Sequence, residues 1–343
     1  MTNDIYYDSI AMDVTNRCNL RCLHCFNSSG DHNFEKKELT LNELKTISKQ
    51  IITLKPSTVC LCGGEPLIRG VEIFEIVTIL KSGGIENVNM VSNGYLIDEK
   101  MARKIRESGV KFIQISVDGQ TSAAHDWLRN KQGSHEHAIN AIKYLVAEGL
   151  YVGVACTPTK KNINEIPELI DMLYSMGVKM FRMQPIMGLG RAKDIKEYYP
   201  TSTDYFKVSR YIERCKKSEK YPNLSFEWGD PLDHIFLLRG GVGARGLTIN
   251  AYGDILISPY IPISFGNLKR HTIQEYIDAG LFDLPKLELV TTLCSKINNE
   301  EELDINSINP IFPELYKSEL MSMDLIDDNI EEKSKPIISS LRS

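Results

Sequence analysis

The first 185 residues alternate between short apolar runs and longer stretches in which apolar side chains recur at helical spacing. Such alternation predicts repeated β-strand and α-helix units that form a parallel sheet. The runs expected to form strands are Ser9–Val14, Thr58–Leu61, Asn87–Val91, Phe112–Val117, Val152–Thr157 and Met180–Gln184. The stretches expected to form helices are Leu41–Thr53, Glu72–Ser82, Glu99–Ser108, His135–Glu148 and Ile163–Met176.

Local signals support these helix boundaries. Thr40-Leu41-Asn42-Glu43 is typical of a capping box. Gly109, Gly149 and Gly177 stand where a helix end favours a left-handed residue. Six strands with parallel crossovers predict an α/β fold, a partial (β/α)6 TIM-like barrel. Active sites of such barrels lie at the carboxyl ends of the strands, so we expect function in the loops that follow them.

The pattern changes after Gly190. It predicts a helix over 204–217, a short strand at 223–228, a hairpin over Leu247–Ile257 with Gly253 and Asp254 in its turn, and a helix at Thr272–Ala279. The final stretch is charged and turn-rich. We therefore expect a barrel core over 1–195, a smaller C-terminal extension over 196–315, and a loosely ordered tail over 316–343.

Composition narrows the class of protein. Hydrophobic residues at 42% and charged residues at 25% are ordinary for a globular protein, and the formal net charge of -5 argues against nucleic acid as a partner. No apolar run approaches the roughly 20 residues of a membrane helix, and the N-terminus lacks the features of a signal peptide. Eight cysteines in 343 residues do not resemble a disulfide framework. These features predict a cytoplasmic protein with reduced thiols and no membrane contact.

The strongest chemical signal is the loop Cys18-Asn19-Leu20-Arg21-Cys22-Leu23-His24-Cys25, which follows the first predicted strand. Cysteine thiolates hold Fe–S clusters, usually four to a cubane, so three protein ligands leave one iron open to another molecule. The alternative is a structural zinc site, which needs four ligands and would recruit His24, Cys60 or Cys62. The spacing alone leaves both readings open.

Together with Gly63-Gly64-Glu65-Pro66 after the second strand, this spacing resembles the radical S-adenosylmethionine (SAM) superfamily. The resemblance implies that Cys18, Cys22 and Cys25 hold a [4Fe–4S] cluster whose fourth iron binds SAM. One electron, from a donor such as flavodoxin or ferredoxin, then cleaves SAM to methionine and a 5′-deoxyadenosyl radical. Gly63 and Gly64 would let the backbone approach the SAM amino group, in a turn shaped by Glu65 and Pro66.

Later motifs extend the resemblance to further SAM contacts. Asn93 lies in the stretch after the third strand that resembles the next family motif, and Ser116 and Asp118 would face the methionine and ribose. Arg129 would pair with the SAM carboxylate, a suitable task for a planar guanidinium. His24 occupies the place of an aromatic residue near the adenine, and Gln184 marks the exit from the barrel.

The extension resembles the SPASM or twitch extension of peptide- and cofactor-maturing members, but without its cysteines. Ser258 stands where those relatives have a cysteine, an earlier one would fall near Val242, and the later cysteine run is reduced to Cys294. Serine is a poor ligand for iron in such a site. We therefore expect a SPASM-like fold with a single cluster, the one held by the loop.

Without a second cluster as electron acceptor, epimerisation or another redox-neutral change is favoured over net oxidation. Cys156 and Cys294 are candidate hydrogen donors, whereas Cys60 is expected to be core packing and Cys62 to line the turn beside SAM. Only 17 residues precede Cys18, too few for a leader-binding domain. The substrate is expected to be a small molecule or a peptide. The alternative function is a zinc- or iron-holding binding module without catalysis.

Overall fold

The computed structural model describes residues 8–31, 35–243, 246–300, 302–314 and 319–343. Nine strands form one sheet in the order β7-β6-β5-β4-β3-β2-β1-β8-β9. Their bounds are β1 Ser9–Asp13, β2 Thr58–Cys62, β3 Asn87–Ser92, β4 Phe112–Ser116, β5 Tyr151–Cys156, β6 Met180–Met183, β7 Ser225–Trp228, β8 Gly246–Ile249 and β9 Ile255–Leu256. Two further short strands, β10 Ile263–Ser264 and β11 Met321–Ser322, pair with each other.

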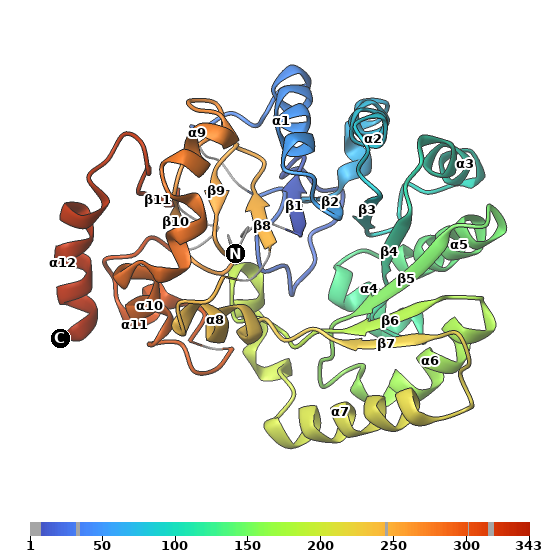
Figure 1. Ribbon diagram of the computed structural model, residues 1–343. Coiled ribbons are helices and arrows are strands. Elements are labelled where there is room, and N and C mark those ends of the chain that lie inside the picture. Colours follow the sequence, from blue (N-terminus) through green and yellow to red (C-terminus); the bar gives the residue numbers. More distant parts are fainter. Residues whose placement is uncertain (1–7, 32–34, 244–245, 301, 315–318) are drawn as a thin grey trace.

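Neighbouring strands from β7 to β8 are all parallel, and only β9 runs antiparallel, in its hairpin with β8. Figure 1 shows the strands as an arc with helices on its outer side. The predicted α/β fold, a partial barrel with a C-terminal extension, is confirmed. The extension is built onto the barrel sheet itself, because β7 joins β6 at one edge and β8 joins β1 at the other. The boundary at 195/196 stays a prediction.

The helices follow the predicted pattern through residue 175 with one addition, α4, which the sequence analysis did not predict as a helix. The helical elements are α1 Leu41–Thr53, η1 Pro66–Arg69, α2 Glu72–Ser82, α3 Glu99–Ser108, α4 Ser122–Arg129, α5 Ser134–Ala147, η2 Ile163–Glu165, α6 Ile166–Ser175, η3 Gly190–Tyr198, α7 Ser202–Lys217, α8 Leu232–Arg239, α9 Ile273–Asp278, η4 Leu281–Lys286, α10 Glu288–Cys294, α11 Ile305–Ile308 and α12 Ile330–Arg342. The capping box predicted at Thr40 is present, with the Thr40 and Glu43 side chains bonded to each other's backbone N–H groups.

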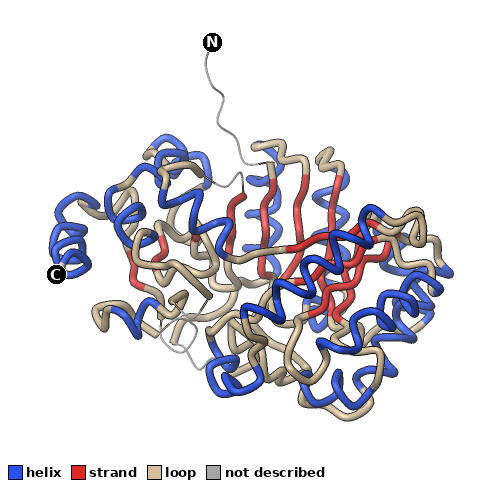
Figure 2. The backbone as a smooth tube through the Cα atoms, turned by 90° about the horizontal axis from the view of Figure 1, so that it is seen from below, coloured by secondary structure: helices blue, strands red, loops and turns tan. Residues whose placement is uncertain are grey.

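Alternation along the strands separates the two faces of the sheet. In β2, Val59 and Leu61 are fully buried, whereas Thr58, Cys60 and Cys62 are partly exposed. The buried positions face the surrounding helices, such as α1 and α2, which Figure 1 shows on the outside of the arc. Figure 2 shows helices packed alongside the strands in a second view. Each fully buried aliphatic side chain contributes about 1.5–3 kcal/mol. The partly exposed positions therefore line the concave face, where the chemistry is expected.

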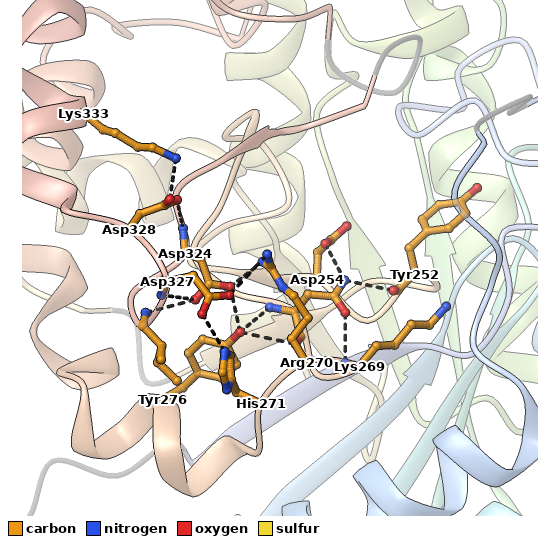
Figure 3. Close-up of polar contacts among 12 residues, drawn as sticks. Tyr252, Asp254, Lys269, Arg270, His271, Tyr276, Asp324, Asp327, Asp328 and Lys333 are labelled. Carbon is orange, nitrogen blue, oxygen red and sulfur yellow. Dashed lines mark hydrogen bonds and ion pairs between the residues drawn. The ribbon is translucent and has the colours of Figure 1, made fainter.

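The C-terminal region is not the loosely ordered tail that the sequence predicts for 316–343. Residues 315–318 lie outside the described part, but α12 is a thirteen-residue helix that buries Ile337, Ile338 and Leu341. Upstream of it, the Asp324 carboxylate accepts hydrogen bonds from the Tyr276 hydroxyl at 2.8 Å and from Arg270 (Figure 3). The prediction was wrong because these contacts join residues about 50 positions apart, which a local reading of charge and turns does not reveal.

Replacing Asp324 by alanine is expected to lower the free energy of unfolding by about 2–4 kcal/mol, because two backbone N–H groups lose their acceptor and the buried Tyr276 hydroxyl keeps, as a donor, only the longer bond to Asn267 O at 3.3 Å. Urea unfolding followed by circular dichroism measures the change. Asp327→Ala is the matched control. Asp327 pairs with the same Arg270 and with His271 but is exposed, so its loss should cost less than about 1 kcal/mol. Equal losses in the two variants would contradict the structural role of Asp324.

Candidate functional site

The cysteine loop leaves the carboxyl end of β1 and is held by backbone contacts from three directions. The Gly64 N–H donates to Thr15 O at 2.8 Å, and the Glu65 N–H donates to Arg17 O at 2.9 Å. From α4, Leu128 O accepts the Leu23 N–H at 2.8 Å. From the segment after β6, the Arg191 guanidinium donates to Cys22 O at 2.9 Å. The loop conformation is therefore set by groups far from it in sequence.

Gly63 and Gly64 are required by their contact with this loop. A Cβ on Gly63 would lie 2.2 Å from Thr15 O, and a Cβ on Gly64 would lie 2.2 Å from Arg17 O. Gly63 also has a φ of +132°, which side-chain-bearing residues rarely adopt. The sequence analysis assigned the glycines to the approach of a ligand. The structure adds that the space beside their Cα atoms is filled by the backbone of the cysteine loop.

Gly64→Ala is expected to displace the loop and to reduce iron bound after anaerobic reconstitution by more than half, because a backbone oxygen 2.2 Å from the new Cβ cannot move aside like a flexible side chain. Iron analysis of the purified variant gives the result. Gly240→Ala is the control, since a Cβ there meets its nearest atom at 3.4 Å and φ is not positive. Full iron loading of Gly64→Ala would show that the close approach is not needed.

The three loop thiols lie close to one another but do not form a site for a single metal ion. Cys22 is buried, and Cys18 and Cys25 are partly exposed. Among the described residues, only His271, Asp324 and Asp327 bring three ligand atoms within 4.8 Å of one another, so at least one pair of the loop sulfurs is farther apart. A zinc ion binds sulfur at about 2.3 Å and would draw all three closer than that.

Burial raises the pKa of the Cys22 thiol to about 11 and also raises the pKa of Cys18. The protein alone thus keeps these thiols protonated at neutral pH. A bound metal deprotonates a thiol outright, so loading the site releases protons.

Asn93 and Glu65 connect the carboxyl ends of β2 and β3 to the loop. The Asn93 side-chain amide donates to Asn19 Oδ1 at 2.8 Å and lies 3.9 Å from Cys18 Sγ. Glu65 is fully buried and accepts from the Asn93 N–H at 2.8 Å, from Ser92 Oγ at 3.0 Å and from the Leu67 N–H at 3.1 Å. Burial raises its pKa to about 7. Glu65 therefore positions the loop through Asn93, which bonds to Asn19 of the loop. The buried Pro66 begins η1 directly after Glu65.

Asp118 and Arg129 form a buried ion pair beside Cys22 of the cysteine loop. Arg129 Nε donates to Asp118 Oδ2 at 2.5 Å, and Arg129 NH1 lies 3.8 Å from Cys22 Sγ. Burial disfavours the charged form of both side chains, but the opposite charge of the partner outweighs this effect. The pKa of Asp118 is therefore lowered and that of Arg129 is raised. Asp118 Oδ1 also accepts from the Thr157 N–H at 3.0 Å. Both carboxylate oxygens thus bind protein donors, and Asp118 acts to orient Arg129.

The remaining predicted SAM contacts lie in the cysteine loop and at the carboxyl ends of β4 and β6. His24 is partly buried and its pKa is lowered to about 4, first by burial and then by the charge of Arg129, so the ring is neutral. Ser116 ends β4 on the concave face, in register with Ala155. Gln184 follows β6 and its amide lies 3.4 Å from the Tyr260 hydroxyl, which links the barrel to the extension.

The unpaired polar atoms of the structure test whether a cofactor fits here. Six buried side-chain polar atoms in the described residues lack a hydrogen-bond partner. Three belong to the cysteine loop, Asn19 Nδ2, His24 Nδ1 and Ser28 Oγ, and two more, Asn89 Oδ1 and Arg182 Nε, belong to concave-face positions of β3 and β6. Buried polar groups are normally paired. The residues present therefore fit a polar group bound between the loop and the concave face.

The two cysteines predicted as hydrogen donors do not reach this opening. Cys156 is 1% exposed and shares the face of Val152 and Val154, which points away from the concave side. Cys294 is fully buried in α10, which packs against α8 and α12. Both thiols lack the access to a substrate that a hydrogen donor needs. Strand and helix phase, not the residue type, decides which way a thiol points, and the donor role of Cys156 and Cys294 stays a prediction.

At the positions of the missing extension cysteines, Ser258 is buried and its Oγ accepts from the Tyr260 N–H at 3.3 Å, and Val242 is exposed.

The sequence analysis also missed residues that hold the cysteine loop. Besides Arg191, the Arg21 guanidinium donates to Cys18 O at 2.7 Å and to Gly30 O at 2.9 Å. No sequence signal separated these arginines from ordinary surface residues.

The fold and site define an α/β partial-barrel enzyme with a three-cysteine cluster loop at the carboxyl ends of its strands. The Radical SAM superfamily model matches residues 12–173, which span the loop and most of the barrel. Over this segment, just under half of the chain, the protein is similar to radical SAM enzymes, a class that uses a [4Fe–4S] cluster and SAM. Among the described residues, no helix is long and apolar enough to cross a membrane.

Curated relatives and solved structures differ in what they act on. The chain is 28% identical over 287 residues to an AdoMet-dependent heme synthase of Methanosarcina barkeri, covering 78% of this chain and 80% of the relative. It is 30% identical over 187 residues to the sporulation killing factor maturation protein SkfB of Bacillus subtilis, covering 54% and 44%. The structure of anSMEcpe with bound AdoMet and the Cp18Cys peptide matches with a TM-score of 0.64 at 17% identity, covering 85% and 84%. The chain spans about half the length of most curated relatives it matches.

Proposed function

We propose that this chain reductively cleaves SAM at a single [4Fe–4S] cluster held by Cys18, Cys22 and Cys25. The observation that carries the proposal is the buried Arg129, whose guanidinium reaches from Asp118 to within 3.8 Å of Cys22 Sγ. A planar charged donor beside a cluster ligand is suited to orient the carboxylate of SAM. The cluster and SAM together supply a 5′-deoxyadenosyl radical that takes a hydrogen atom from the substrate.

The surrounding residues would orient SAM and exclude water. The Asn93 amide restrains the Cys18 side of the loop. The neutral His24 ring, with its unpaired Nδ1, would pack near the adenine. Ser116 and Gln184 would complete the pocket from the carboxyl ends of β4 and β6, and Gly63 and Gly64 keep the backbone of the opposite wall close to the loop.

We further propose a SPASM-like extension without an auxiliary cluster, and a redox-neutral reaction such as epimerisation. The buried Ser258 and the buried Cys294 support this, since neither offers an accessible thiolate. The relatives include a heme synthase, a peptide maturation protein and a structure with a bound peptide, so the substrate class is a peptide or a biosynthetic small molecule. The electron would come from a flavodoxin- or ferredoxin-type donor.

Anaerobic reconstitution tests this proposal directly. About four irons per chain, brown absorbance, and release of 5′-deoxyadenosine from SAM under dithionite are expected. About eight irons would overturn the single cluster. A colourless protein with stoichiometric zinc and no SAM cleavage would overturn the enzyme and favour the second candidate, a metal-holding binding module.

A further inference from the structure

Two thiols outside the cluster loop lie in contact on the concave face. Cys60 and Cys62 alternate along β2 with the fully buried Val59 and Leu61, and their Sγ atoms are 3.3 Å apart. The sequence analysis expected Cys60 to be core packing and Cys62 to line the turn beside SAM. The strand phase presents both on the same side of β2, partly exposed, so Cys60 is not a core residue.

Charged groups lie on the same face of the sheet as this pair. Asp13 is the β1 partner of Cys62 in the register of the sheet. Asp13 and Arg182 both act electrostatically on the Cys62 thiol. Arg182 lies on β6, and β3, β4 and β5 separate β6 from β2 in the sheet order. Asp13 and Arg182 occupy partly exposed positions in the alternation of their own strands, as Cys60 and Cys62 do in β2.

The pair also lies next to the cluster loop. Cys62 O accepts the Val14 N–H at 3.0 Å at the carboxyl end of β1, where the loop begins. Gly63 and Gly64, the next two residues, contact the backbone of Thr15 and Arg17. The other cysteines outside the loop, Cys156, Cys215 and Cys294, are all buried. Cys60 and Cys62 are thus the thiols outside the loop that combine partial exposure with a place beside it.

We propose that the Cys60–Cys62 pair is the hydrogen-atom donor of the reaction, replacing the roles predicted for Cys156 and Cys294. The inference rests on the proposed function, which generates a carbon-centred radical on the substrate. That radical takes the hydrogen atom of one thiol: a C–H bond forms, an S–H bond breaks, and sulfur is left one electron short. One electron from the flavodoxin- or ferredoxin-type donor and one proton restore the thiol.

The surroundings suit this cycle. The second thiol lies 3.3 Å from the first, sulfur to sulfur. Burial raises the pKa of Asp13 to about 7, so this carboxyl group can hold and return the proton near neutral pH. The S–H bond is weaker than an aliphatic C–H bond, which makes the transfer from sulfur to carbon favourable.

The first test is independent of turnover. The protein is treated with iodoacetamide without denaturant, and labelling of each cysteine is mapped by mass spectrometry. Cys60 and Cys62 are expected to react several-fold faster than Cys156 and Cys294. Labelling no faster than those buried thiols would overturn the proposal.

The second test uses the 5′-deoxyadenosyl radical itself as the acceptor, because the substrate is unidentified. Thiol hydrogens exchange with D2O, so SAM cleavage by the reconstituted protein in D2O, without added thiols, should yield 5′-deoxyadenosine that carries one deuterium. The deuterated fraction should fall several-fold in Cys60→Ala/Cys62→Ala and stay at the wild-type level in Cys156→Ala. The single variants identify which thiol donates first.

The outcomes separate this inference from the proposed function. Absence of 5′-deoxyadenosine from the wild-type protein would overturn the proposed function, and the donor role with it. Formation of 5′-deoxyadenosine with the same deuterated fraction in the wild type and the double variant would leave SAM cleavage standing and overturn the donor role alone.

Discussion

Replacing any one of Cys18, Cys22 and Cys25 by alanine is expected to abolish the brown absorbance and to reduce 5′-deoxyadenosine formation by at least about 10³-fold, which corresponds to about 4 kcal/mol of barrier. The loop offers only these three thiols: Cys156 and Cys294 are buried elsewhere, and Cys60 and Cys62 are fixed on strand β2, outside the loop. Iron content, the visible spectrum and 5′-deoxyadenosine measured after anaerobic reconstitution give the result.

Cys215→Ala is the control, since Cys215 is buried in α7 and should leave iron binding intact. A single loop variant that retained both the spectrum and SAM cleavage would show that another residue completes the site. Retention of stoichiometric zinc by all three variants would favour a metal site elsewhere.

Asp118→Asn is expected to lower the free energy of unfolding by about 3–5 kcal/mol, because it leaves the buried Arg129 charge without its counter-ion. Asp118 is fully buried and Arg129 is 8% exposed, so water cannot replace the lost carboxylate. The affinity for SAM should also fall, by roughly 10–100-fold, as Arg129 loses the contact that aims it at the cluster. Chemical unfolding and equilibrium binding of SAM to the reconstituted protein measure the two effects.

The double variant Asp118→Asn/Arg129→Gln separates stability from binding. Removing both charges should restore at least half of the lost stability, since replacing a whole buried pair costs less than breaking it. SAM binding should stay weak, because the guanidinium is gone. Recovery of SAM affinity together with stability would show that Arg129 is a structural residue and not a SAM ligand.

The order of elements through residue 185 could be predicted from the sequence because it depends on local physics. Apolar spacing and caps mark α1, α2 and α3 with the bounds that the structure shows. The eight-residue α4 was missed because it is short and half of its residues are polar, with Trp127 and Leu128 as its large apolar side chains. Its last residue is Arg129, so the missed helix is the element that delivers this arginine to the cluster loop.

The candidate site could be predicted only in part. The sequence named the cluster cysteines, Asn93, Asp118 and Arg129, because they lie in short motifs. It did not show that Asp118 forms an ion pair with Arg129, or that Arg21 and Arg191 donate hydrogen bonds to backbone oxygens of the loop. These contacts join segments up to 169 positions apart, as between Arg191 and Cys22, and no spacing rule encodes them.

The sequence by itself determined the class of chemistry, since three cysteines at fixed spacing can be read without coordinates, and it determined the β/α alternation, since periodicity is local. The tertiary structure alone decided which thiols are buried and which are partly exposed. It buried Cys156 and Cys294 and turned Cys60 and Cys62 toward the concave face. The physical reason is that a one-residue step along a strand reverses the direction of a side chain.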